Sequence, residues 1–132
     1  MKYNFDVKIY SKDKSKRICY FEDVLSMDFT RDHYGDSLVT FESTDIGNAS
    51  KLQRISSTEF FGNFSVQIIM NGAPHYMLDS AYVTEVKNKL SFNKDMKSVI
   101  TLKSLNARQP TESELRKYKI KLIKQFNEGE TL

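Results

Sequence analysis

A long run of alternating side chains between residues 60 and 104 constrains the fold of this chain more than any other feature. Apolar residues recur at every second position over 64–70, and the next two residues are Asn71-Gly72. Asn-Gly is the dipeptide that most readily accepts positive φ at both central positions of a tight hairpin turn. We therefore expect two antiparallel strands joined by a two-residue turn at Asn71-Gly72.

The segment after this turn predicts a long amphipathic strand. One period-2 phase holds Tyr82, Thr84, Val86, Asn88, Leu90 and Phe92. The other phase holds Ala81, Val83, Glu85, Lys87, Lys89 and Ser91. Asn93-Lys94-Asp95 ends the strand, and a return strand is expected at 98–104. Such a hairpin is longer than a small core requires, and we expect its first face to pack on the core and its second face to be solvated.

Four shorter strands are predicted in the first third of the chain, at 3–10, 17–21, 25–30 and 38–43. A chain of 132 residues with 9 Phe and 7 Tyr suits one mainly-β domain. We therefore assign residues 1–132 to a single domain. Its antiparallel β-sandwich or barrel is expected to span residues 3–105.

Two segments are not expected to be strands. Residues 111–127 predict a C-terminal α-helix, because Thr111 and Glu114 match a capping box ahead of an apolar stripe. That stripe either packs on the sheet or docks on a neighbouring subunit. Residues 44–59 have no clean period and allow one or two helical turns at 49–55. They form either a loosely held connection or an interaction loop, in which the contacting residues would be Ile46, Lys51, Gln53 and Arg54.

No motif in the sequence predicts catalysis, a metal or a cofactor. The densest polar cluster, residues 30–36, contains His33, yet it lies between two predicted strands, where Asp, Gly and His are ordinary turn residues. Cys19 is the single cysteine and is expected to be a small buried side chain. We therefore expect a protein that is not an enzyme and that needs no cofactor.

The charge pattern leaves one alternative open. Lysines gather at 12–17, around the long hairpin and on the terminal helix, but acidic residues are interspersed and the net charge is only +3. A small β-barrel module that binds a protein or single-stranded nucleic acid fits this pattern as well. No apolar run approaches the length of a membrane span, so we expect no membrane insertion.

The order of the strands resembles the tail-tube fold of contractile injection machines. The resemblance rests on the turn at Asn71-Gly72 and on three segments, which are Val39-Thr40-Phe41-Glu42-Ser43-Thr44, Leu78-Asp79-Ser80-Ala81-Tyr82-Val83-Thr84-Glu85-Val86 and Ile100-Thr101-Leu102-Lys103-Ser104. This family includes phage tail-tube and baseplate-hub proteins and the haemolysin-coregulated tube proteins of type VI secretion. The helix lies mid-chain in many tube proteins, so a tube, hub or baseplate role stays open here.

The resemblance implies a structural, ring-forming component of a phage tail or related injection machine. Tube subunits donate long hairpins to a shared inner barrel, which removes exposed sheet edges. The face expected to line the lumen or to contact a neighbour carries Glu85, Lys87, Lys89 and Ser91. The implied partners are copies of this chain and other tail or baseplate proteins, with nucleic acid only passing through the lumen. The implied location is the cytoplasm during assembly and then the virion tail or injection-machine particle.

Overall fold

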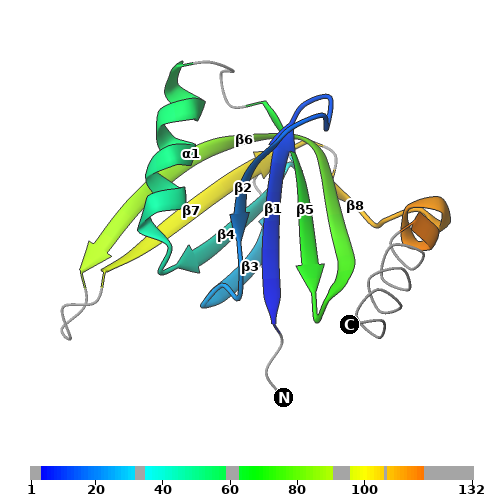
Figure 1. The fold of residues 1–132 in the computed structure, drawn as a ribbon, viewed down its shortest axis with the longest axis horizontal. Coiled ribbons are helices and arrows are strands. Elements are labelled where there is room, and N and C mark those ends of the chain that lie inside the picture. Colours follow the sequence, from blue (N-terminus) through cyan, green and yellow to red (C-terminus); the bar gives the residue numbers. More distant parts are fainter. Residues whose placement is uncertain (1–3, 32–34, 59–62, 91–95, 106, 118–132) are drawn as a thin grey trace, which may run out of the picture.

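The computed structural model describes residues 4–31, 35–58, 63–90, 96–105 and 107–117. In these residues the chain is mostly antiparallel β-structure, which confirms the predicted fold class (Figure 1). The elements are β1 (Phe5–Ser11), β2 (Arg17–Phe21), β3 (Ser26–Arg31), β4 (Ser37–Ser43), α1 (Ile46–Thr58), β5 (Phe64–Met70), β6 (Ala73–Leu90), β7 (Met96–Ser104) and β8 (Ala107–Arg108).

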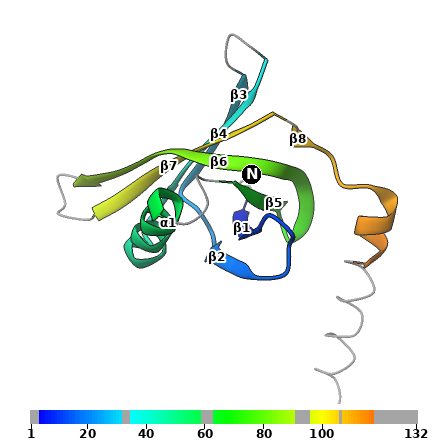
Figure 2. The ribbon, with the colours of Figure 1, turned by 90° about the horizontal axis from the view of Figure 1, so that it is seen from above.

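The strands form one sheet that folds over on itself. Their order is β2-β1-β5-β6-β7-β4-β3, and β8 also pairs with β6. The strand β6 serves both halves, because its first part up to Ala81 pairs with β5 and its second part pairs with β7. Phe21 of β2 and Phe41 of β4 meet edge to face at 5.2 Å between ring centroids, although their strands are not neighbours in the sheet. The two halves therefore face each other across a common interior (Figure 2).

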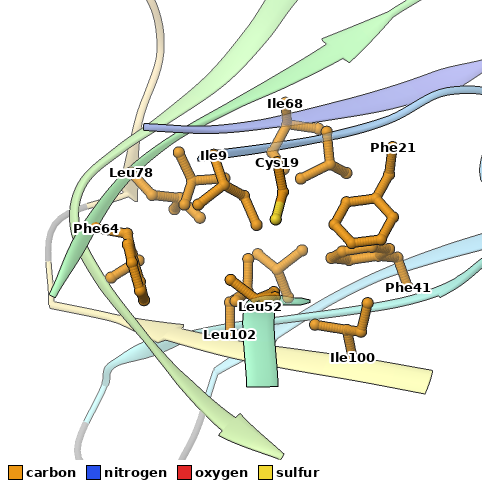
Figure 3. Packing of buried hydrophobic residues seen from close by; sticks show 14 of the residues in the cluster. Ile9, Cys19, Phe21, Phe41, Leu52, Phe64, Ile68, Leu78, Ile100 and Leu102 are labelled. Carbon is orange, nitrogen blue, oxygen red and sulfur yellow. The ribbon is translucent and has the colours of Figure 1, made fainter. Parts of the chain in front are cut away.

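The hydrophobic core fills that interior (Figure 3). Alternate residues of the strands point inward, as the sequence pattern predicts for half-buried strands. Those with almost no exposed surface include Val7, Ile9, Val39, Val66, Ile68, Leu78, Ile100 and Leu102. The helix α1 contacts β2, β6 and β7 and adds two more buried side chains. It therefore covers one side of the space between the two halves.

The predicted hairpin turn is confirmed. Asn71 has φ 51° and Gly72 has φ 82°, the left-handed values that a two-residue turn of this kind requires. The turn also holds the start of β1, because the Asn71 backbone N–H donates to the Asn4 carbonyl at 2.7 Å. In return, the Asn71 side-chain oxygen accepts from the Asn4 N–H at 2.9 Å.

The prediction for 44–59 is partly right: the helical turns allowed at 49–55 are present, but they belong to the 13-residue helix α1 and not to a loop. Asp45 caps the helix, and its Oδ1 accepts the backbone N–H of Asn48 at 3.0 Å. Ala49 and Leu52, one turn apart, are both 0% exposed. The Asn48 side chain donates to the Tyr20 carbonyl at 3.0 Å and ties the helix to β2. A cap and a short buried stripe therefore stabilise a helix in a polar segment.

The predicted C-terminal helix is present in the described part of the chain. Residues 112–117 are helical, and the capping box forms as expected. Glu114 Oε1 accepts the Thr111 N–H at 3.0 Å, and Thr111 Oγ1 accepts the Glu114 N–H at 3.2 Å. Residues 118–127 of the prediction lie outside the described residues.

Candidate functional site

One half of the folded sheet has two unpaired strand edges. We call this half the hairpin sheet; it consists of β3, β4, β7 and residues 82–90 of β6. At one edge, β3 pairs only with β4. At the other edge, residues 82–90 of β6 pair only with β7, because β5 stops pairing at Ala81. Within the described residues, both edges thus offer free backbone N–H and C=O groups to a further strand.

A β-bulge at Thr84 determines which side chains of β6 face the core and which face away from it. Val83 pairs with Leu102, but the next pair is Glu85 with Thr101, so Thr84 is an extra residue on β6. Its hydroxyl donates to the Thr101 carbonyl at 3.1 Å. A one-residue shift in register sends side chains to the opposite face. The bulge therefore inverts the alternation in the middle of the strand.

The predicted apolar phase is consequently wrong before the bulge and partly right after it. Before the bulge, Ala81 and Val83 are the inward-facing residues. After it, Val86 packs on the core. Leu90 continues this phase but is 68% exposed, so its predicted burial is wrong. Leu90 pairs with Met96 at the end of the hairpin, where Met96 is itself 47% exposed. Phe92 lies outside the described residues.

The opposite face of the hairpin sheet exposes side chains of both charges. Of the residues predicted to line a lumen or contact a neighbour, Glu85, Lys87 and Lys89 are all exposed here. Lys87 Nζ lies 3.0 Å from Glu85 Oε1, and Lys97 Nζ lies 3.7 Å from Glu42 Oε2 on the neighbouring strand β4. Ser91 lies outside the described residues. The polar character of this face is therefore present, and its role as a lumen or subunit contact stays a prediction.

Both open edges also carry exposed apolar side chains. On the β3 edge, Phe29 is 39% exposed, and Leu25 just before the strand is 54% exposed. Phe29 pairs with the buried Val39, so it belongs to the core-facing side of the hairpin sheet, as Leu90 does at the other edge. The Phe29 ring lies 5.1 Å from the Tyr76 ring, between centroids. The apolar residues of the two edges thus share one face, and the sequence alternation contains that signal.

The predicted interaction-loop residues sit on α1 instead of on a loop. Lys51, Gln53 and Arg54 are exposed along the helix, and Ile46 at its start is half-buried. They belong to a different element from the two open edges. Their role in contacts stays a prediction.

The described residues show little that could support acid–base or nucleophilic chemistry. They contain no group of three or more His, Cys, Asp or Glu side chains able to hold a metal. Burial raises the pKa of Cys19 to about 11, which keeps the thiol protonated and unreactive. His75 packs edge-on against Tyr76 at 4.8 Å between centroids, and His33 lies outside the described part. No helix in that part has the length and apolarity needed to cross a bilayer.

The chain has an antiparallel β-fold that also occurs among solved structures. No family model matches the sequence, and no curated protein matches it either. Among solved structures, the fold is similar to the crystal structure of Hcp1 from Salmonella typhimurium, with a TM-score of 0.54 and 14% sequence identity. The match covers 76% of this chain and 81% of Hcp1. At this identity the likeness shows a shared fold alone.

Proposed function

We propose that this chain is a structural, ring-forming subunit of a secretion or injection machine, in the tube, hub or baseplate of a phage tail or a related apparatus. The observation that carries the proposal is the hairpin sheet with its two open edges. The fold likeness to Hcp1 and the resemblance of the strand order to tail-tube proteins support it. The subunit would assemble in the cytoplasm and then remain in the particle, together with other tail or baseplate proteins.

The direction of the strands makes such a ring geometrically simple. In the hairpin sheet β6, β7, β4 and β3 alternate in direction, because each neighbouring pair is antiparallel. Consequently β3 runs opposite to β6. A ring with cyclic symmetry repeats these directions from copy to copy. The β3 edge of one copy would therefore meet the β6 edge of the next as an ordinary antiparallel pair.

The side chains at the two edges suit the same junction. Joining the edges would bring Phe29 of one copy to the same face as Leu90 of the next and would cover apolar surface that is now exposed. On the other face, Asp28 of β3 and Lys89 of β6 carry opposite charges. The charged face of the hairpin sheet would then line the inside of the ring, where nucleic acid or protein would pass.

The experiment tests the two edges against a matched surface position. Leu90→Asp and Phe29→Asp should each abolish rings while leaving the circular dichroism spectrum unchanged, since both side chains are exposed in the monomer. Leu105→Asp is the control, because Leu105 is 59% exposed but belongs to neither edge. Sedimentation velocity and negative-stain imaging at high concentration report the rings.

Two results would refute the proposal. One is a wild-type protein that stays monomeric at every concentration, alone and with tail proteins. The other is a Leu105→Asp variant that loses rings as completely as the two edge variants, since the loss would then not come from the edges.

A second candidate is a small binding module for single-stranded nucleic acid or for a protein. It is favoured by the exposed cations Lys12, Lys16 and Arg17 in and after the β1–β2 turn. The nearby aromatic ring of Tyr20 is already flanked by Lys8 Nζ at 5.3 Å and by Arg17 Cζ at 5.4 Å, which hinders base stacking. A steep loss of affinity for a random oligonucleotide as salt rises would support this module.

A further inference from the structure

One arginine at the end of the sheet makes an unusually complete set of hydrogen bonds. Arg108 in β8 donates from Nε to Asp79 at 2.6 Å and from Nη2 to the same carboxylate at 3.0 Å. It donates from Nη1 and Nη2 to Glu114 at 2.7 and 3.2 Å. Its remaining N–H reaches the Gln109 carbonyl at 3.3 Å. A guanidinium has five N–H donors, so all of them are in use.

The carboxylate of Glu114 has two tasks in this arrangement. It accepts from Arg108, and it is also the acidic partner of the capping box at Thr111. The bonds that start helix 112–117 and the bonds that attach it to the sheet therefore share one side chain. Loss of the attachment would remove a constraint on the cap, and loss of the cap would free the carboxylate from its position.

Within the described part of the chain, Arg108 and Glu114 make the polar contacts between this helix and the sheet. Among the described residues, no hydrogen bond or ion pair other than those between Glu114 and Arg108 joins the helix to a strand. Arg116, for comparison, lies 4.0 Å from Glu112 inside the helix. The strand β8 contributes two backbone pairs to β6, Met77 with Arg108 and Leu78 with Ala107. Arg108 thus lies at the point where the C-terminal segment meets the sheet.

We propose that Arg108 is a latch that couples the formation of helix 112–117 to its docking on β6. The first turn of a helix is unstable in water by itself, because nucleation costs more than its first hydrogen bonds return. When the latch opens, residues 112–117 lose their helical structure together while the sheet keeps its fold. Residues 112–117 therefore have two states, docked helix and released chain.

The ionisation of the cluster identifies salt, and not mild acid, as the expected trigger. The hydrogen bonds from Arg108 lower the pKa of Asp79 and lower the pKa of Glu114 from 4.5 to about 2. Lys14 Nζ, 3.6 Å from Asp79, adds a further cation from the β1–β2 turn. A carboxylate with a depressed pKa stabilises the docked state above its ordinary pKa, and for Glu114 this effect is lost progressively as the pH falls from 4.5 to about 2. These side chains are partly exposed, so salt screens them.

Hydrogen–deuterium exchange of the full chain, read by mass spectrometry, tests the latch. Arg108→Met should speed exchange of residues 112–117 at least about tenfold, while β1 to β7 keep their protection. Arg116→Met is the matched control and should exchange as the wild type does. Arg108→Lys keeps the charge but not the forked geometry and should fall between the two. In the wild type, raising salt from about 0.05 M to about 1 M should speed exchange of the same residues alone.

Three results would overturn the latch. Unchanged protection of 112–117 in Arg108→Met would show that other contacts hold the helix. Faster exchange throughout the sheet would show that Arg108 stabilises the whole fold. Equal effects of Arg108→Met and Arg116→Met would show that the helix depends on its own charge pattern. The salt series on the wild type decides the question if a variant does not fold.

Discussion

The two halves of β6 belong to one 18-residue strand, yet they have different surroundings. The first half, up to Ala81, pairs with β5 on one side and meets β8 and the end of β7 on the other. Leu78 and Ala81 in this half are almost completely buried. The second half has one partner strand, and Leu90 at its end is 68% exposed. The bulge at Thr84 marks the change between them.

This difference separates the residues that fold the subunit from those available for other contacts. The free energy of folding depends mainly on apolar surface that the chain buries within itself. The second half of β6 buries less, and it keeps an open backbone edge and an apolar tip. A strand built only for stability would end soon after the bulge. The extra length therefore favours a role outside the monomer.

The largest effect should come from the first half. Leu78→Ala should lower the free energy of unfolding by about 3 kcal/mol, because it leaves a cavity in a closely packed core. Leu90→Ala is its counterpart in the second half and should change stability by less than about 0.5 kcal/mol. Urea denaturation measures both. Similar losses in the two variants would erase the distinction between the halves.

The next largest effect should come from the turn that begins the strand. Gly72→Val should destabilise the subunit by about 1–2 kcal/mol, since a β-branched residue tolerates the φ of 82° poorly. Ala73→Val, at the adjacent exposed residue, is the control. Thermal unfolding followed by circular dichroism reports the midpoint. If the midpoint of Gly72→Val equals that of the control, the turn contributes no conformational constraint to the first half.

A smaller effect is expected at the boundary itself. Thr84→Val keeps the branched shape but removes the hydroxyl that donates to the Thr101 carbonyl. The free energy of unfolding should fall by about 0.5–1 kcal/mol. Thr84→Ser restores a hydroxyl and should recover part of the loss. Chemical denaturation of both variants sharpens the comparison, because no difference between Val and Ser would mean that the bulge does not depend on this hydrogen bond.

The smallest effect on folding should come from the polar face of the second half. Lys87→Glu combined with Lys89→Glu changes the local charge by about four units and touches no core residue. Stability should stay within about 0.5 kcal/mol of the wild type. In the proposed ring, assembly should weaken, because the added negative charges would repeat around the ring at close range. Size-exclusion chromatography with circular dichroism separates the two effects, and an unfolded double variant would place these lysines in the core.

Most of the β-structure could be predicted because its signals are local. Alternation predicts the bounds of most strands within one or two residues, and Asn71-Gly72 predicts the turn. The exceptions are β6, which begins at Ala73 although the predicted phases begin at Ala81, and β8, which was not predicted. The bulge at Thr84 has no comparable signal in the sequence, since threonine is common on both faces of a strand. For this reason the predicted inward-facing phase is wrong at Tyr82 and Thr84.

The helix α1 and the Arg108 cluster show two further limits. Asp45 is a usable cap signal, but Gly47 and a run of serines weaken the intrinsic helix propensity of 46–58. Packing against β2, β6 and β7 decides the outcome, and a single sequence does not display it. Arg108 and Asp79 lie 29 residues apart, so only the fold brings them together. Glu114 was visible as a capping residue, while its second partner was not.

The attachment of α1 to β2 also affects how easily other chains reach the end of the sheet. The Asn48 side chain donates to the Tyr20 carbonyl at 3.0 Å, and the Cys19 thiol donates to the Asn48 carbonyl at 3.7 Å. The chain's own helix therefore contacts the end strand β2 at Cys19 and Tyr20. Exposed end strands are the usual starting points of uncontrolled aggregation. Because α1 lies against β2, a second chain has less access to this end strand.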